Sequence, residues 1–183
     1  MPKKLKSIAV YCGHEFGNNK KFRRDAAAVG KMLAENGIRM VFGGGNVGLM
    51  GAVASAAHEN GGKVIGISTD DVIAKQEPAH PKIKVKVVNG VNERKQIMFD
   101  LSDAFIILPG GIGTLNELSD IMTMQQIGET NKPLFFLNTD NFWEPFGDLI
   151  KHMIECEFIG DMSEYTIFGA DTVAQLKKMI LNY

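Results

Sequence analysis

Short apolar runs alternate along this chain with longer segments in which apolar residues recur at helical spacing. A short apolar run is typical of a buried parallel strand, and apolar residues three or four positions apart are typical of a helix packed by one face. The pattern predicts strands at Ser7–Tyr11, Arg39–Phe42, Lys63–Ile67, Val85–Val88, Ala104–Leu108 and Pro133–Leu137. It predicts helices at Lys20–Glu35, Leu49–Glu59, Asn92–Leu101, Leu115–Ile127, Glu144–Glu157 and Thr172–Leu181. This alternation indicates an α/β fold with a doubly wound, mainly parallel sheet and helices on both faces.

The whole chain, residues 1–183, is expected to form one domain, because no linker or repeat divides it. Residues 68–83 fit no clear pattern, and we expect a loop or a short helix over the site there. The net charge of −1 gives no indication of nucleic-acid binding, and no apolar run is long enough for a membrane span. With no recognisable signal peptide and only two cysteines, a reduced, cytoplasmic setting is expected.

The most informative segment is residues 108–117, Leu-Pro-Gly-Gly-Ile-Gly-Thr-Leu-Asn-Glu, between a predicted strand and a predicted helix. Glycines at such a turn let backbone N–H groups approach an anion, and the helix N-terminus adds partial positive charge. We therefore expect the turn with Gly110, Gly111 and Gly113 to bind a phosphate, with Glu117 in reach of the attached group. The alternative is a capping box, in which Thr114 caps the helix and Glu117 returns to the N–H group of Thr114.

A second glycine cluster lies at residues 43–51, Gly-Gly-Gly-Asn-Val-Gly-Leu-Met-Gly, and matches G-x-G-x-x-G. Asp70 and Asp71 follow about twenty residues later, as a ribose-binding acid would in a dinucleotide site. The cluster follows the second strand rather than the first, which disfavours an NAD(P) site. A mononucleotide or sugar-phosphate loop that uses Gly44 and Gly45 is the preferred interpretation, and close packing of helix on sheet is the alternative.

A third element is the charged run Asn92-Glu93-Arg94-Lys95 at the start of a predicted helix. Its structural interpretation is a solvated helix face. Its functional interpretation is that Arg94 or Lys95 reaches a phosphate or pairs with Glu117, and arginine suits this better because its planar fork binds bidentately. The four histidines form no metal-binding pattern, and neither a nucleophile elbow nor a P-loop is present, so no metal or cofactor is expected.

Taken in order, these elements resemble the cytokinin-activating phosphoribohydrolases, the Lonely Guy family, whose members often carry a lysine decarboxylase-like label. The similarity extends from Ser7 to about Ile159 and includes the opening Val10-Tyr11-Cys12-Gly13 and the later Asn131-Lys132-Pro133-Leu134. The motif P-G-G-x-G-T-x-x-E with an upstream R-K is much more specific than either glycine cluster alone.

The resemblance implies a Rossmann-like fold and a homodimer with active sites near the subunit interface. It implies hydrolysis of the N-glycosidic bond of a purine nucleoside 5′-monophosphate, AMP or N6-modified AMP, to the free base and ribose 5-phosphate. The family's catalytic arginine and glutamate fall on Arg94 and Glu117. Its phosphate-contacting positions fall on residues 110, 111, 113 and 114, and Thr123 matches a substrate-lining position.

Several residues depart from the family pattern around the expected base site, namely His14, His80, Asn92 and Ile112. These departures affect the identity of the base more than the reaction. The main alternative of another class is a non-catalytic nucleotide or molybdenum-cofactor carrier of the same superfamily. The presence of both Arg94 and Glu117 disfavours a pure carrier.

Overall fold

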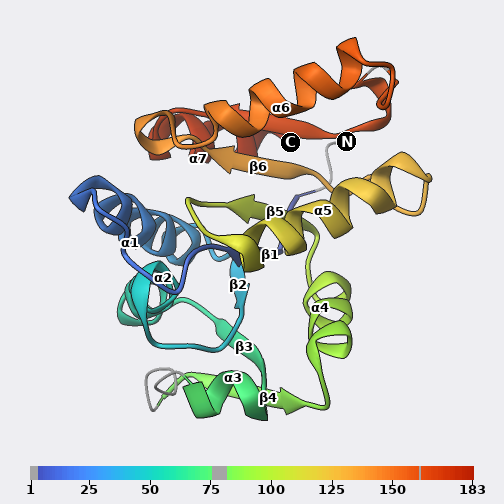
Figure 1. Cartoon of the computed structure of the whole chain (residues 1–183). Helices are drawn as coiled ribbons and strands as arrows, with labels where there is room; N and C mark the ends of the chain where they lie inside the picture. Colours follow the sequence, from blue (N-terminus) through green and yellow to red (C-terminus); the bar gives the residue numbers. More distant parts are fainter. Residues whose placement is uncertain (1–3, 76–81, 161) are drawn as a thin grey trace.

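The computed structural model describes residues 4–75, 82–160 and 162–183 and shows one parallel sheet of seven strands (Figure 1). The sheet order is β4-β3-β2-β1-β5-β6-β7, and every neighbouring pair is parallel. The strands are β1 (Ser7–Tyr11), β2 (Arg39–Phe42), β3 (Val64–Thr69), β4 (Lys84–Val88), β5 (Ala104–Ile107), β6 (Leu134–Leu137) and β7 (Ile167–Ala170). The predicted doubly wound α/β fold is confirmed.

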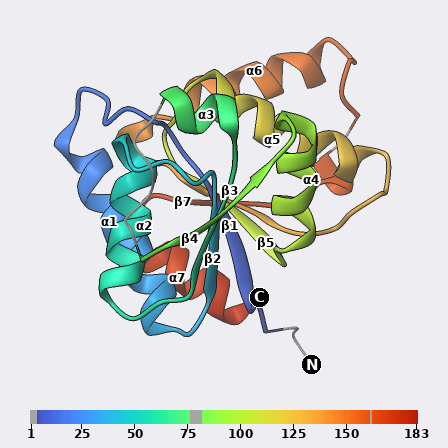
Figure 2. The same cartoon turned by 90° about the horizontal axis from the view of Figure 1, so that it is seen from below.

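Helices cover both faces of the sheet, with α1, α2 and α7 on one side and α4, α5 and α6 on the other (Figure 2). The helices are α1 (Lys20–Glu35), α2 (Gly48–Glu59), α3 (Asp70–Lys75), α4 (Val91–Asp100), α5 (Ile112–Gln126), α6 (Glu144–Glu155) and α7 (Val173–Asn182). Short 3₁₀ turns lie at Thr139–Asn141 and Met162–Glu164. None of the helices in the described part of the chain is long and apolar enough to cross a membrane.

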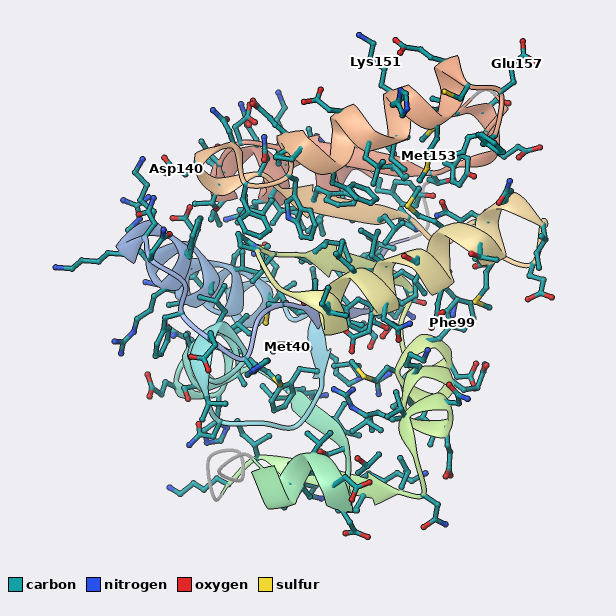
Figure 3. The ribbon with its side chains drawn as sticks, viewed as in Figure 1. Met40, Phe99, Asp140, Lys151, Met153 and Glu157 are labelled. Carbon is teal, nitrogen blue, oxygen red and sulfur yellow. The ribbon has the colours of Figure 1, made fainter. Side chains whose placement is uncertain are left out.

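The core consists of two apolar layers, one on each face of the sheet. All residues of β1, β5 and β6 are buried, which explains their nearly continuous apolar sequences. On one face α1 and α2 pack so closely that a Cβ at Gly30 would lie 2.1 Å from the carbonyl oxygen of Val53. On the other face no residue of α6 is fully buried. Lys151 on α6 and Glu157 just after it project outward, and Met153 points back toward the sheet (Figure 3).

All six predicted strands and six predicted helices are present, with shifts of a few residues at their ends. The pattern missed β7, whose Ile-Phe-Gly-Ala sequence is short and only half-buried. The expected short helix within residues 68–83 is α3, whereas His80 lies outside the described residues. Helix α5 begins at Ile112 rather than Leu115, and this earlier start changes the interpretation of the glycine motif.

The chain winds outward from β1 to β4, returns to β5 beside β1, and winds outward again to β7. The switch point of the sheet therefore lies between β1 and β5. Their loops meet there, because Gly13 donates a backbone hydrogen bond of 3.0 Å to the carbonyl oxygen of Pro109. Ligands of doubly wound sheets bind in the crevice outside the carboxyl ends of the strands at such a point.

Candidate active site

A cavity of about 140 Å³ lies at the switch point, above the carboxyl ends of β1 and β2 and beside the first turns of α5. It brings together residues that are far apart in the sequence: residues 10–14, Gly43, Met50, Val72, Arg94, residues 111–114 and Glu117. The predicted catalytic pair and most of the predicted phosphate loop therefore share one cavity.

The N-terminus of α5 faces this cavity. Gly111 is the N-cap and provides no side-chain hydrogen bond, so the first N–H groups of the helix remain available to an anion. Gly110 lies against Thr114, whose hydroxyl oxygen would be 2.1 Å from a Cβ at position 110. Glycine is thus required at 110 by packing, whereas nothing crowds Gly111 or Gly113 within 4 Å. The open positions are the ones a phosphate could approach.

The capping-box interpretation is wrong. Thr114 is the third residue of α5 and is buried, and Glu117 lies a further turn inside the helix. Neither side chain satisfies an N–H group at the helix start, because the structure has the cap three residues earlier, at Gly111. One glycine of the motif, Gly113, also lies inside the helix rather than in the turn.

Arg94 reaches the cavity from α4 and is held by the ends of two strands. Its Nε donates to the carbonyl oxygen of Ile67 at 2.9 Å, and one terminal nitrogen donates to that of Gly43 at 3.4 Å. Its other terminal nitrogen lies 3.6 Å from Oε1 of Glu117. The solvated-face interpretation of the charged run is therefore wrong for Arg94, although Glu93 does lie at the surface and accepts a hydrogen bond from the N–H group of Asn89.

Glu117 is a largely buried carboxylate, with 12% of its side chain exposed. Burial raises the pKa of Glu117 from 4.5 to about 7, and Asp120 adds to this, although Arg94 and Lys95 act in the opposite direction. A carboxyl group with a pKa near neutrality beside a cation is typical of acid–base chemistry.

Lys95 lies away from the phosphate loop. Its ammonium group contacts Asp120 at 2.6 Å and Asn116 at 3.0 Å, so it joins α4 to α5. It lines a neighbouring groove of about 440 Å³ between these helices, together with Thr123. The structure thus places Lys95 and Thr123 beside Glu117 but outside the glycine-lined cavity, and their roles in substrate binding stay predictions.

Of the three consecutive glycines, Gly43 lines the cavity, whereas Gly44 and Gly45 are buried and do not line it. Gly44 has φ +82° and packs against Ser68, and the N–H group of Gly45 points to the sulfur of Met50 at 3.3 Å. Gly43 instead makes room for Arg94, because a Cβ there would lie 2.1 Å from the guanidinium. The contacts of this cluster are packing contacts, and a binding role for Gly44 and Gly45 stays a prediction.

Sequence reasoning did not identify several wall residues as site candidates, namely Val10, Tyr11, Cys12, Gly13, Met50 and Val72. Tyr11 ends β1 and Cys12 follows it directly, and both entered only through the family resemblance. Their position at the end of the first strand could have identified them as site residues, because the switch point adjoins that strand. Burial raises the pKa of Cys12, so this thiol stays neutral and unreactive. Within the described ranges no cluster of three or more His, Cys, Asp or Glu side chains is arranged to hold a metal ion.

Residues 50–180 match a family model described as "Possible lysine decarboxylase". The chain is 38% identical over 180 residues to the cytokinin riboside 5′-monophosphate phosphoribohydrolase LOG of Oryza sativa subsp. japonica, covering 98% of this chain and 74% of the rice protein. It is 38% identical over 148 residues to the cytokinin riboside 5′-monophosphate phosphoribohydrolase of Rhodococcoides fascians, covering 80% and 75% of the two chains.

Among solved structures, the molybdenum cofactor carrier protein of Chlamydomonas reinhardtii superimposes with a TM-score of 0.69 over 97% of this chain and 99% of that chain. Its sequence identity is 19%, so this likeness concerns the fold alone.

Proposed function

The chain belongs to the family of cytokinin riboside 5′-monophosphate phosphoribohydrolases, and from this premise we propose that it hydrolyses the N-glycosidic bond of a purine ribonucleoside 5′-monophosphate. The substrate would be AMP or an N6-modified AMP. The products would be the free base and ribose 5-phosphate.

The observation that carries this proposal is the position of the Arg94–Glu117 pair relative to the start of α5. From Ile112 to Glu117 the helix rises by about 7.5 Å, which is comparable to the span of a ribose 5-phosphate. A phosphate on the first N–H groups of α5 would therefore bring the anomeric carbon close to the Glu117 carboxylate.

Each group then has a defined role. The N-terminus of α5 neutralises the phosphate, and Arg94 aims the Glu117 carboxylate and favours its ionised form. As the glycosidic bond breaks, its electron pair goes to the base nitrogen and positive charge develops on the ribose, which the carboxylate stabilises. A water oxygen bonds to the anomeric carbon, Glu117 accepts the water proton, and the base finally takes up a proton. The reaction is balanced by one water and needs no further reactant.

The direct test is to incubate the protein with AMP, N6-isopentenyl-AMP, GMP, CMP and adenosine and to measure the free base by chromatography. We expect AMP to be cleaved and adenosine to be cleaved poorly, because only the monophosphate can use the helix N-terminus. Equal cleavage of adenosine and AMP would contradict the phosphate site. Tight AMP binding without release of adenine would favour a nucleotide carrier.

The pH profile provides a second test. If Glu117 must be ionised, kcat/KM for AMP should rise with pH through about 7, the pKa of Glu117, and reach a plateau above it. Below that pKa, activity should fall about tenfold per pH unit as the carboxyl becomes protonated. The AMP phosphate itself titrates near pH 6, so AMP binding to Glu117→Gln, measured over the same pH range, serves as the control. A profile that is flat from pH 5 to 9 would exclude this role.

We also propose a homodimer formed through α4 and α5. Met98 and Met122 on these two helices lie in the core of one chain and need no partner. The dimer is supported by the partly exposed Met124, the 61% exposed Ile127 and the groove between the two helices. Sedimentation equilibrium at micromolar concentration should give twice the chain mass of 20.1 kDa, and a monomer would contradict the dimer.

A further inference from the structure

Tyr11 is the last residue of β1 and only 3% of its surface is exposed. Its ring is fixed by stacking on Phe105, with ring centroids 5.9 Å apart and planes inclined by 9°. Buried aromatic residues of this kind usually serve packing alone. Tyr11 differs from them because its hydroxyl-bearing side chain lines the cavity that contains Arg94 and Glu117.

Tyr11 lies where two hollows meet. It lines the cavity with Arg94 and the phosphate loop, and it also lines the groove between α4 and α5. The residues common to both hollows are Tyr11 and Glu117. A phenol and a carboxylate therefore border the same space from opposite elements, β1 and α5.

The hydroxyl of Tyr11 forms no hydrogen bond with any residue that the structure describes. The hydroxyl is not sealed off in the core, because the fully buried side-chain N and O atoms that lack a partner among the described residues are Ser68 Oγ and Trp143 Nε1. The hydroxyl instead faces cavity space, where a ligand or a water molecule can provide a hydrogen-bond partner.

The charge around this point favours a neutral phenol. Burial raises the pKa of Tyr11 well above 10, and the negative charge of Glu117 raises it further, against a smaller effect of Arg94. The hydroxyl is therefore a permanent donor at physiological pH. The titratable or charged groups that face Glu117 from the surrounding elements are Tyr11, Cys12 and His14 on and after β1, Arg94 and Lys95 on α4, and Asp120 on α5.

We propose that Tyr11 is a positioning residue of the active site, whose hydroxyl donates a hydrogen bond to a water molecule that in turn donates to the Glu117 carboxylate. This inference rests on the proposed function. This water bridge orients the carboxylate oxygen that Arg94 does not contact and favours its ionised form, opposing the effect of burial. Tyr11 and Arg94 then hold Glu117 from two sides.

The test is Tyr11→Phe, which removes one oxygen and keeps the stacked ring. A hydrogen bond to a charged group is worth enough to move a pKa by about one unit. The acid limb of kcat/KM for AMP should therefore move up by about one pH unit. The variant should lose about tenfold activity at pH 6 and recover to within about twofold of the wild type at pH 9. Tyr165→Phe, on the same face of the sheet but outside both hollows, should leave the limb unchanged.

An unchanged acid limb in Tyr11→Phe, or a loss of activity that is equal at every pH, would overturn the proposal. A second measurement does not depend on AMP being the substrate, namely the melting temperature from pH 5 to 9 for the wild type, Glu117→Gln and Tyr11→Phe. The wild type should lose stability relative to Glu117→Gln as pH rises through 7, and in Tyr11→Phe this loss should extend about one unit higher. A shift in melting behaviour without any AMP cleavage would retain the water bridge from Tyr11 to Glu117 and reject the proposed reaction.

Discussion

Replacement of Glu117 by Gln should lower the turnover of AMP by about 10²–10⁴-fold, the usual contribution of a positioned acid–base group. The change keeps the size of the side chain but removes the charge that would stabilise the developing ribose cation. Nucleotide binding should change little, because the phosphate contacts arise from the start of α5. Turnover measured beside AMP affinity checks both statements.

The same variant should be more stable than the wild type at pH 8. The folded protein raises the pKa of Glu117 from 4.5 to about 7 and so binds a proton more tightly than the unfolded chain. The associated stability is present below the unfolded pKa and is lost as pH rises through 7. Glutamine does not ionise, so the variant keeps this stability at high pH. The expected gain over the wild type is on the order of 1–3 kcal/mol in the free energy of unfolding, or a few degrees in Tm.

A control for both effects is Glu93→Gln, the same substitution at a surface position on α4. It should preserve turnover and should not stabilise the protein at pH 8. Near-normal turnover in a folded Glu117→Gln protein would refute the catalytic assignment, whereas equal loss in the Glu93 variant would indicate a general disturbance of α4 and α5.

The second large effect is expected for Arg94→Lys, which should reduce kcat/KM for AMP by about 10²-fold although the charge is retained. Each nitrogen of the guanidinium has a separate neighbour: the carbonyl oxygens of Ile67 and Gly43, and the carboxylate of Glu117. A lysine ammonium on its flexible stem cannot reproduce this fork. Losing one or two hydrogen bonds to a charged group accounts for the expected size of the effect.

The chain provides a matched control in Arg39, the first residue of β2, at the amino ends of the strands and so opposite the cavity. Its Nε donates to Ser7 Oγ and a terminal nitrogen to the carbonyl oxygen of Leu101, so it has the same kind of bonding far from the cavity. Arg39→Lys should lower stability slightly and leave kcat/KM unchanged. If both variants behave alike, Arg94 is a structural residue and not part of the catalytic machinery.

The alternation of apolar runs was sufficient to predict the sheet, because buried parallel strands such as β5 and β6 are apolar along their whole length. The half-buried edge strand β7 lacks that signal and was missed. Helix starts were harder: α5 begins within a glycine-rich segment that has poor helix propensity, and Ile112 at its first position is 82% exposed.

The site was predictable only where its residues belong to recognisable sequence motifs. Arg94 and Glu117 stand in specific motifs, and the structure brings them together. Lys95 stands beside Arg94 in the sequence, but successive helical residues point about 100° apart, and so it contacts Asp120 instead. The contribution of Tyr11 depends on which strand lies at the switch point, and this information exists only once the strand order is known.

The closeness of Gly43 to the Arg94 guanidinium has an evolutionary consequence. A methyl group at position 43 would displace the guanidinium from its present place, although 51 residues separate the two positions. Selection that keeps Arg94 therefore also keeps Gly43. In a relative without the arginine, a larger residue can replace the glycine. Across relatives the residues at positions 43 and 94 should therefore covary. The first glycine of this G-x-G-x-x-G match is then explained by the space that the Arg94 guanidinium needs and not by a dinucleotide site.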